Sequence, residues 1–411
     1  MVEDYKILFW TEYFGKGTRE GYKISNCGTE YTCTFTHDRA QIGNSSLLYF
    51  HIPEYKPEDL PPEQYRDKSI RKIPWVLFSA ESTANYPFMA NKEKLQIFDY
   101  SSTYRRDSHF PISYFGNDLM EVVLRPQAPR GNNTDRASIA WIVSNCNANN
   151  NRNYYVKELM KYIDIDIYGH CMENKKWPEG KDTTEIIQDY EFYLAFENSN
   201  CQDYVTEKLA NAFAAGVVPI VDGPKSYDFV SPTANALINI NAFENPRELA
   251  EYLHSLLADR DKYNELLSYK QGAPLSPAFL KEWDYSNKTG LDALSIVERS
   301  NCNVCRVARD IAIFKQSHPL ATAKEFWEFA TTQLTPAPDY HTGLPADDSC
   351  IPSKWSIYRP SHAWLYSFLA LLGVVIICIL IKFSYYPLKR RYISSYKKLG
   401  NLEQDTAIPL E

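Results

Sequence analysis

The 411-residue sequence contains neither of the familiar glycine-rich phosphate-binding motifs. The patterns G-x-G-x-x-G and G-x-x-x-x-G-K-[ST] are both absent, which excludes the usual dinucleotide-binding and P-loop signatures. A long basic run is also missing from the part of the chain expected to fold, and the formal net charge is −7. These features argue against nucleic acid as the main partner.

An export signal is missing from the start of the sequence. Met1–Trp10 contains Glu3, Asp4 and Lys6 and has no apolar core of the kind that signal peptides carry. A large N-terminal domain reaches the secretory lumen only with such a signal. We therefore expect either that the true start of the protein precedes this sequence or that the membrane topology inferred below is wrong.

The composition is that of a folded protein, with 44% hydrophobic and 23% charged residues. The length suits two domains of about 150–200 residues each. Residues 125–136 are rich in Pro, Gly, Asn and charge and show no periodicity. This break predicts a link between an N-terminal domain at 1–136 and a C-terminal domain at 137–334.

One segment near the C-terminus is long and uncharged. Residues 363–381 contain no charged side chain, and as a helix they would extend about 28 Å, close to the hydrocarbon thickness of a bilayer. Lys and Arg residues gather in the tail at 382–411. The sequence therefore predicts a stalk at 335–362, one transmembrane helix and a cytosolic tail, with the main domain across the membrane.

Glycosylation acceptors and cysteines favour an oxidising lumen. The N-x-[ST] triplet occurs at Asn44, Asn132 and Asn287. Of nine cysteines, one lies inside the uncharged segment, which leaves eight, an even number suited to disulfides.

Both halves of the chain alternate short apolar strands with helices or polar segments, which is typical of α/β domains. The expected strands are 7–10, 47–50, 75–79, 139–143, 163–168, 192–196 and 217–221. The clearest unit is 190–224, which reads as strand, polar turn, helix and strand. Ligands bind beyond the carboxyl ends of such strands, close to helix N-termini. The sequence therefore predicts an anion-binding site formed by residues such as Glu197, Asn198, Thr206, Glu207 and Lys208.

Four segments carry motifs that occur together in one enzyme family. FENSNCQDYVTEKLANAFAAGVVPIV resembles a donor-binding motif, and AWIVSNCNANNNRNYYVKEL resembles a Trp-x-Val-Ser-Asn segment with a following Arg. TYRRDS matches a Tyr-Arg-Arg-Asp-Ser hallmark, and FSAESTANYP resembles the segment with the catalytic Glu. From about residue 7 to 306, the chain thus resembles the α1,3-fucosyltransferases, glycosyltransferase family 10. The resemblance implies a GT-B fold, in which two Rossmann-like domains face each other across a cleft.

The resemblance implies a role for each matching residue. Glu81 aligns with the family's catalytic base in the acceptor-binding N-terminal half. Lys208 and Arg152 align with the cations that hold the diphosphate of GDP-fucose in the C-terminal half. The other donor-binding candidates are Asn198, Tyr204 and Glu207.

Three further residues have two interpretations each. Arg105 and Arg106 belong to the hallmark and either contact the site or stabilise the domain fold. His51 follows a strand of the first half and is a candidate acceptor or donor contact. Residues 83–85 read Thr-Ala-Asn where many members have Pro-Ser-His, a departure that concerns the acceptor side of the site.

The resemblance also implies a disulfide arrangement. Cys302 and Cys305 form a CxxC motif, and no second pair at zinc-site spacing lies nearby. In the family, two cysteines near the start of the catalytic unit pair with the CxxC near its end. Cys27 and Cys33 fit the first pair, and the sequence leaves the connectivity open.

The implied function is the inverting transfer of L-fucose from GDP-fucose to GlcNAc of a glycoprotein or glycolipid glycan, in α1,3 linkage. Such a transfer needs a base for the acceptor hydroxyl and positive charge on the leaving diphosphate. One alternative is a core α1,3-fucosyltransferase that acts on the innermost GlcNAc of an N-glycan. The other is a non-catalytic membrane glycan-binding protein with the same fold.

The expected donor substrate is GDP-fucose, without a tightly bound cofactor. GT-B transferases hold the diphosphate with a helix and cationic side chains, and no DxD-like cluster follows a strand here, so no metal ligands are predicted. Family members can be stimulated by Mn²⁺, which leaves the metal question open. The expected location is the Golgi membrane, single-pass, with the catalytic domain in the lumen.

Overall fold

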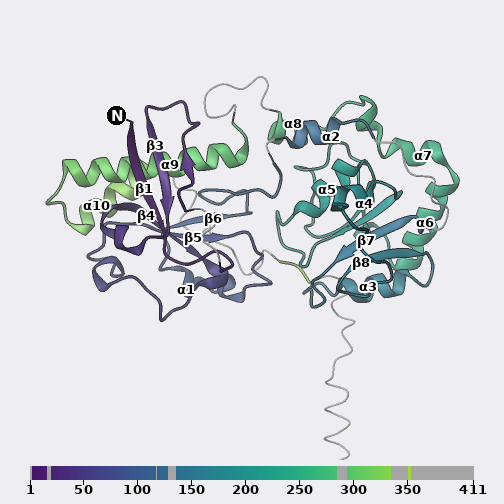
Figure 1. The fold of residues 1–411 in the computed structure, drawn as a ribbon, viewed down its shortest axis with the longest axis horizontal. Coiled ribbons are helices and arrows are strands. Elements are labelled where there is room, and N and C mark those ends of the chain that lie inside the picture. Colours follow the sequence, from purple (N-terminus) through teal and green to yellow (C-terminus); the bar gives the residue numbers. More distant parts are fainter. Residues whose placement is uncertain are drawn as a thin grey trace, which may run out of the picture. The chain divides into compact units, whose positions relative to one another are not determined.

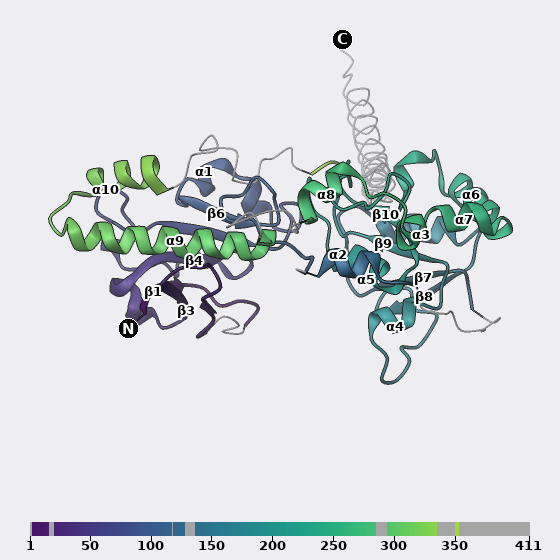
Figure 2. The ribbon, with the colours of Figure 1, turned by 90° about the horizontal axis from the view of Figure 1, so that it is seen from above.

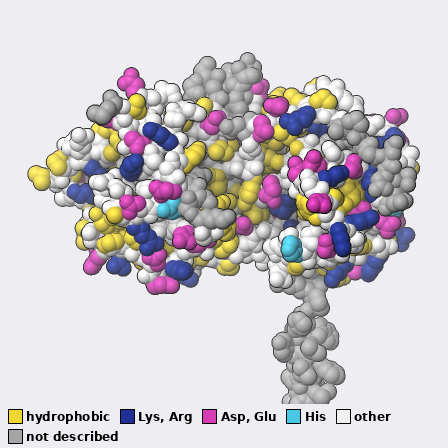
Figure 3. All heavy atoms as spheres, in the orientation of Figure 1, with side chains coloured by type: hydrophobic (Ala, Val, Ile, Leu, Met, Phe, Trp, Pro, Cys, Tyr) yellow, Lys and Arg dark blue, Asp and Glu magenta, His cyan; other side chains and the backbone are white. Residues whose placement is uncertain are grey.

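The computed structural model describes residues 2–15, 20–116, 118–127, 136–284, 294–334 and 350–352. The chain divides into two compact units, 1–357 and 358–411. All residues of the second unit lie outside the described ranges, so the structure below is that of the first unit. On the face of this unit seen in Figure 3, acidic and basic side chains are intermingled.

The first half of the chain forms a six-stranded sheet with the order β2-β3-β1-β4-β5-β6 (Figure 1). Neighbouring strands pair in parallel, except β2 with β3. Parallel sheets are covered on both faces, and their strands are therefore continuously apolar. The strands are β1 (Glu3–Phe9), β2 (Lys23–Ile24), β3 (Tyr31–Thr36), β4 (Ser45–His51), β5 (Trp75–Ser79) and β6 (Tyr100–Thr103).

Successive side chains of these strands enter two different cores. Phe9 and Tyr49 lie in the core that also contains residues of α9 (Ile296–Ser317) and α10 (Ala323–Phe329). Leu8 and Leu48 lie in the core on the opposite face, with Leu95 of α1 (Lys92–Leu95). This is the period-two alternation of a strand with both faces buried.

Helix α9 runs along the first sheet (Figure 2) and contacts β1, β3 and β4. Two disulfides fasten it there, Cys27–Cys302 and Cys33–Cys305. They join the two cysteine pairs that the family resemblance matched. Residues 296–334, which the sequence assigns to the second domain, pack on the first sheet in the structure. An amphipathic pattern shows that a helix has an apolar face without showing which sheet covers it.

The second half forms a five-stranded parallel sheet with the order β11-β10-β9-β7-β8. Helix α2, although it precedes residue 136, packs against α5 of this half. The strands are β7 (Ile139–Val143), β8 (Ile165–Gly169), β9 (Phe192–Phe196), β10 (Val218–Asp222) and β11 (Ile238–Asn239). The helices are α2 (Leu119–Leu124), α3 (Arg152–Leu159), α4 (Thr183–Ile187), α5 (Glu207–Ala215), α6 (Pro246–Ala258), α7 (Arg260–Glu265) and α8 (Pro277–Trp283). Two such α/β halves agree with the predicted GT-B class.

The predicted membrane helix requires a correction. Across the ranges that the structure describes, no helix combines the length and apolar character needed to cross a membrane. The transmembrane helix expected at 363–381 is therefore not supported, and neither is the single-pass Golgi location that rested on that helix. Residues 363–381, most of the predicted stalk and the predicted tail lie outside the described residues.

Candidate active site

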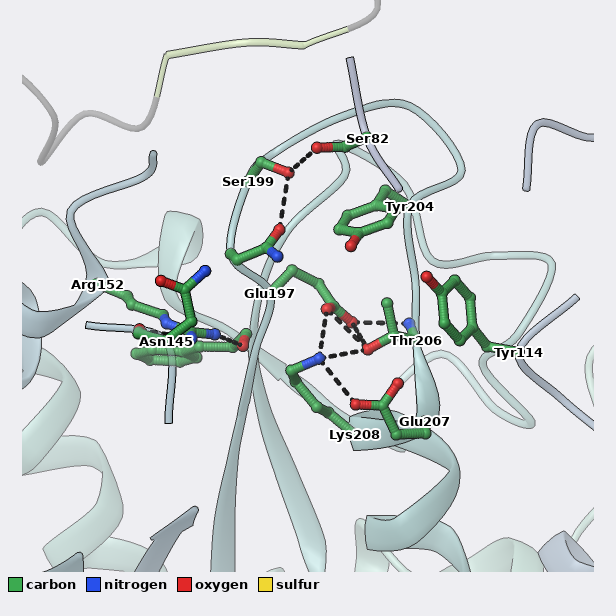
Figure 4. Close-up of polar contacts among 12 residues, drawn as sticks. Ser82, Tyr114, Asn145, Arg152, Glu197, Ser199, Tyr204, Thr206, Glu207 and Lys208 are labelled. Carbon is green, nitrogen blue, oxygen red and sulfur yellow. Dashed lines mark hydrogen bonds and ion pairs between the residues drawn. The ribbon is translucent and has the colours of Figure 1, made fainter. Parts of the chain in front are cut away.

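Loops at the carboxyl ends of parallel strands carry most of the predicted site residues. The loop after β9 spans residues 197–206 and leads into α5, the loop after β7 leads into α3, and the loop after β5 contains Glu81. Figure 4 shows side chains from all three loops around Glu197 and Tyr204. This edge of a parallel sheet is where α/β proteins bind ligands.

Glu197 is a buried carboxylate beside the start of α5. It accepts hydrogen bonds from the backbone N–H and the hydroxyl of Thr206, both at 2.8 Å, and lies 3.2 Å from Lys208 Nζ (Figure 4). Burial raises the pKa of Glu197, while Lys208 and Thr206 oppose that rise. The carboxylate therefore fixes the first turn of α5 and orients the lysine.

Lys208 supplies the cation of this helix start. Its Nζ also lies 3.0 Å from the Glu207 carboxylate and donates to Thr206 Oγ1 at 2.7 Å. Burial alone would lower the pKa of Lys208, but Glu197 and Glu207 outweigh it and the pKa is raised, so the ammonium is charged at neutral pH. The lysine side chain remains 21% exposed. An anion at the N-terminus of α5 would therefore meet both the ammonium and the helix N–H groups.

Arg152, the first residue of α3, is buried at the same edge of the sheet. Its Nη1 donates to the carbonyl of Phe196 at 2.7 Å, and its Nη2 donates to the carbonyl of Asn145 at 3.2 Å. Its Nε is buried without a hydrogen-bond partner. Burial lowers the pKa of Arg152, and the charge of Glu197 opposes that shift. The guanidinium thus places positive charge between the end of β9 and the loop after β7 (Figure 4).

Glu81 meets Tyr204 from the opposite half of the chain. Its Oε2 accepts hydrogen bonds from Tyr204 Oη at 3.3 Å and from Asn85 Nδ2 at 3.1 Å. Tyr114 lies beside Tyr204, with ring centroids 6.2 Å apart, and donates to the carbonyl of Ala80 at 2.6 Å. Burial raises the pKa of Tyr204 far above its usual value, so its hydroxyl remains a donor. The structure therefore brings the predicted base together with a predicted donor-binding residue.

Further hydrogen bonds hold the loops after β5 and β9 together. The hydroxyls of Ser82 and Ser199 lie 2.7 Å apart, and Ser199 donates to Asn198 Oδ1 at 3.1 Å. The loop after β7 joins them through Asn149 Nδ2, which donates to Asn85 Oδ1 at 2.8 Å. Asn198 therefore lies at the meeting point of the two halves.

The two hallmark arginines make structural contacts. Arg105 pairs with Asp107 at 2.6 Å and lies 3.9 Å from Asp203. Arg106 pairs with Glu282 of α8 at 2.6 Å, and its backbone N–H donates to Asp203 at 3.2 Å. These contacts favour the fold-stabilising interpretation of both arginines.

His51 belongs to a separate cluster. Its Nδ1 pairs with Glu54, and its backbone N–H donates to Thr11 Oγ1 at 2.6 Å. Burial lowers the pKa of His51, although Glu54 opposes that shift. The ring packs among aromatic residues that include Tyr13 and Phe78.

Sequence reasoning missed two residues of this region. Tyr114 lies outside every motif, so no pattern pointed to it. Asp222 ends β10, is buried, and accepts hydrogen bonds from Asn200 Nδ2 at 2.6 Å and Asn150 Nδ2 at 3.2 Å. Burial raises the pKa of Asp222 to about 7, while Asn200 and Arg152 oppose that rise. The sequence signal that points to Asp222 and its asparagine partners is the occurrence of polar residues directly after successive strands.

The remaining predicted sites are placed as follows. Two further disulfides, Cys146–Cys171 and Cys201–Cys350, pair the other cysteines of the described ranges. The glycosylation candidate Asn44 is exposed, whereas Asn132 and Asn287 lie outside the described residues. Within the described part of the chain, no group of three or more His, Cys, Asp or Glu residues is placed to hold a metal ion.

Known proteins resemble this chain along most of its length. It is 26% identical to GDP-fucose protein O-fucosyltransferase 3 of Xenopus laevis over 388 residues, which cover 87% of this chain and 78% of the relative. The human protein of the same name is 29% identical, with 81% and 71% covered. The α-(1,3)-fucosyltransferase B of Drosophila melanogaster is 29% identical, with 68% and 67% covered.

A solved structure of an α1,3-fucosyltransferase shares the fold. It superposes with a TM-score of 0.50 at 18% identity, covering 75% of this chain and 92% of that one. A family model described as Fucosyltransferase, N-terminal, matches residues 3–115, and one described as Glycosyltransferase family 10 (fucosyltransferase) C-term matches residues 133–321. Since these two matches together span well over half of the sequence, the chain belongs to glycosyltransferase family 10, the fucosyltransferases.

Proposed function

We propose that this fucosyltransferase transfers fucose from GDP-fucose to an acceptor hydroxyl with inversion, using Glu81 as the base. The supporting observation is the convergence of Glu81 with the start of α5. The Tyr204 hydroxyl donates to Glu81 at 3.3 Å, and Tyr204 lies two residues before Thr206, the N-cap of α5. This geometry supports a site that combines a base with a helix start that binds the diphosphate, as an inverting transfer requires.

The proposed reaction is a single displacement. The Glu81 carboxylate takes the proton of the acceptor hydroxyl while that oxygen forms a bond to the anomeric carbon of fucose. The bond from this carbon to the diphosphate oxygen breaks on the other side, and GDP leaves with the electron pair. Lys208 and the N–H groups of α5 stabilise the negative charge that develops on GDP.

The other donor-binding residues position the nucleotide sugar in this proposal. Arg152 adds positive charge near the diphosphate. The Glu207 side chain is 56% exposed and forms an ion pair with Lys208. This position suits hydrogen bonds to sugar hydroxyls. Tyr204 and Asn198 lie between the donor side and Glu81, where they orient the fucose ring.

The favoured acceptor is a side-chain hydroxyl of a protein, on serine or threonine. Several similar relatives are named as protein O-fucosyltransferases, and their similarity extends over most of this chain. The second candidate is the GlcNAc hydroxyl of a glycan in α1,3 linkage, as expected from the motifs. The name of the Drosophila relative supports this candidate.

An acceptor panel tests the proposal. The purified chain would be incubated with GDP-fucose and either proteins that expose Ser or Thr, or glycans that end in GlcNAc. GDP release and intact mass would report transfer, and fragmentation would identify the linkage. Fucose on a Ser or Thr supports the favoured acceptor, and fucose on GlcNAc supports the second. Donor binding without transfer to either class would contradict the proposal.

A further inference from the structure

The loop that carries Tyr204 is covalently attached to a distant segment of the chain. Cys201 of this loop is fully buried and forms a disulfide with Cys350. The two cysteines also form an isolated antiparallel β-bridge, and the backbone N–H of Ile351 donates to the carbonyl of Asn200 at 2.8 Å. Residues 350–352 therefore hold this loop through a disulfide, a β-bridge and a backbone hydrogen bond.

The disulfide lies against the half of the chain that carries Glu81. Cys350 Sγ is 2.8 Å from the hydroxyl of Thr83, two residues after the base. Cys201 belongs to a small apolar core with Tyr104 and Tyr204, whose rings are 4.8 Å apart. The bridge thus sits where the loops after β5 and β9 meet.

A tight turn connects the disulfide directly to Tyr204. The backbone N–H of Tyr204 donates to the carbonyl of Cys201 at 3.1 Å. Asp203, inside this turn, has a positive φ of 61°, a left-handed conformation that Asp adopts in tight turns. Fixing Cys201 therefore fixes the turn, and the turn sets where the Tyr204 hydroxyl points.

We infer that the Cys201–Cys350 disulfide is a positioning element for catalysis, which holds Tyr204 in hydrogen-bonding contact with the Glu81 carboxylate. The inference rests on the proposed function, because it concerns the orientation of the proposed base. Glu197 and Thr206 hold the Lys208 side chain, and neither residue belongs to the bridge. Loss of the bridge therefore affects turnover more than donor binding.

Steady-state kinetics of the full chain test this inference. The C201A/C350A variant should lose about tenfold in kcat, comparable to the loss of one hydrogen bond to a charged group, while its affinity for GDP stays within about twofold. Tyr204→Phe should lose a similar factor. The triple variant should be no slower than Tyr204→Phe alone, because both changes remove the same contact. Losses that multiply in the triple variant, or an unchanged kcat in C201A/C350A, would overturn the inference.

Two controls complete the test. Gln202→Ala alters an exposed residue of the same loop and should leave kcat unchanged. Thr83→Val keeps the disulfide and removes the hydroxyl that contacts Cys350 Sγ. A two- to threefold loss in kcat, about that of one weak hydrogen bond, is expected even if the bridge-free chain fails to fold. An unchanged kcat in Thr83→Val would then count against the inference. Glu81→Gln separates the two ideas, because full activity in that variant would overturn the proposed function itself.

Discussion

At the scale of single residues, Glu81 depends on two donors, Tyr204 and Asn85. Glu81→Gln keeps the shape of the side chain and an acceptor oxygen but removes its basicity. We expect transfer to fall by about 10²–10⁴-fold while GDP-fucose affinity is retained, because the donor-side cations are untouched. Product formation and calorimetric GDP binding measure the two effects. Exposed Glu63→Gln is the matched control, and an active Glu81→Gln would remove this residue as the base.

Lys208 carries a second prediction at this scale. Lys208→Ala should weaken GDP and GDP-fucose alike, by about 10–100-fold, because each loses a charge-assisted contact with the diphosphate. It should also lower the melting temperature, since Glu197 would remain buried without its cation. GDP titration of the folded variant separates the two effects. Unchanged GDP affinity would show that another cation holds the diphosphate.

The raised pKa of Asp222 predicts that the stability of the protein depends on pH. Its pKa is raised to about 7 in the folded protein, from an ordinary value of 3.8. Between these values the unfolded chain is ionised while the folded protein keeps the proton, so this residue makes stability fall as pH rises from about 4 to 7. Asp222→Asn lacks this titration and should gain stability relative to the parent over the same interval. Denaturant unfolding of both chains at pH 5, 6, 7 and 8 checks this, and a constant difference would contradict it.

At the scale of elements, the strand and helix patterns around the site were predictable from sequence. Helix α5 ends at Ala215 and is followed by Gly216, which has a positive φ of 68°, and the helix lies inside the unit predicted at 190–224. The burial of the Arg152 side chain was not predictable, because a motif gives the type of a residue but not its hydrogen-bond partners. Nor was Tyr114, which reaches the site through tertiary packing alone.

Gly169 ends β8 and gives a prediction about this element. Its φ is +107°, and an added Cβ would lie 2.3 Å from the carbonyl oxygen of Val143 on the neighbouring strand. Gly169→Ala should therefore reduce the free energy of unfolding by about 3 kcal/mol or more, through strain and a backbone clash. Gly180→Ala is the matched control, since φ is +74° there but nothing lies within 4 Å, and about 1 kcal/mol is expected. Equal losses in chemical denaturation would contradict the clash.

At the scale of the whole molecule, the two α/β halves exchange segments. Helix α2 comes from the first half of the sequence and packs in the core of the second sheet, whereas α9 comes from the end and packs in a core of the first sheet. The domain limits at 136 and 334 were drawn from composition, which follows chain order and cannot detect such an exchange. The cysteine pairs were found by resemblance, but their connectivity depends on the register of α9 against β3, which spacing does not contain.

The two bridges at α9 close nearly the same loop, with sequence separations of 275 and 272 residues. While one bridge remains, removing the other opens only a short loop of about ten residues, which costs roughly 3 kcal/mol in the chain-entropy model. Removing both bridges frees the long loop and should cost roughly 5 kcal/mol more. The free energy of unfolding lost by C27A/C302A/C33A/C305A should therefore exceed the sum of the losses in C27A/C302A and C33A/C305A. Denaturant unfolding of the three variants measures the excess. C146A/C171A is the control, because it closes a separate loop and its loss should simply add to either. Additive losses for the two α9 bridges would mean that they stabilise the fold through local packing rather than by closing one shared loop.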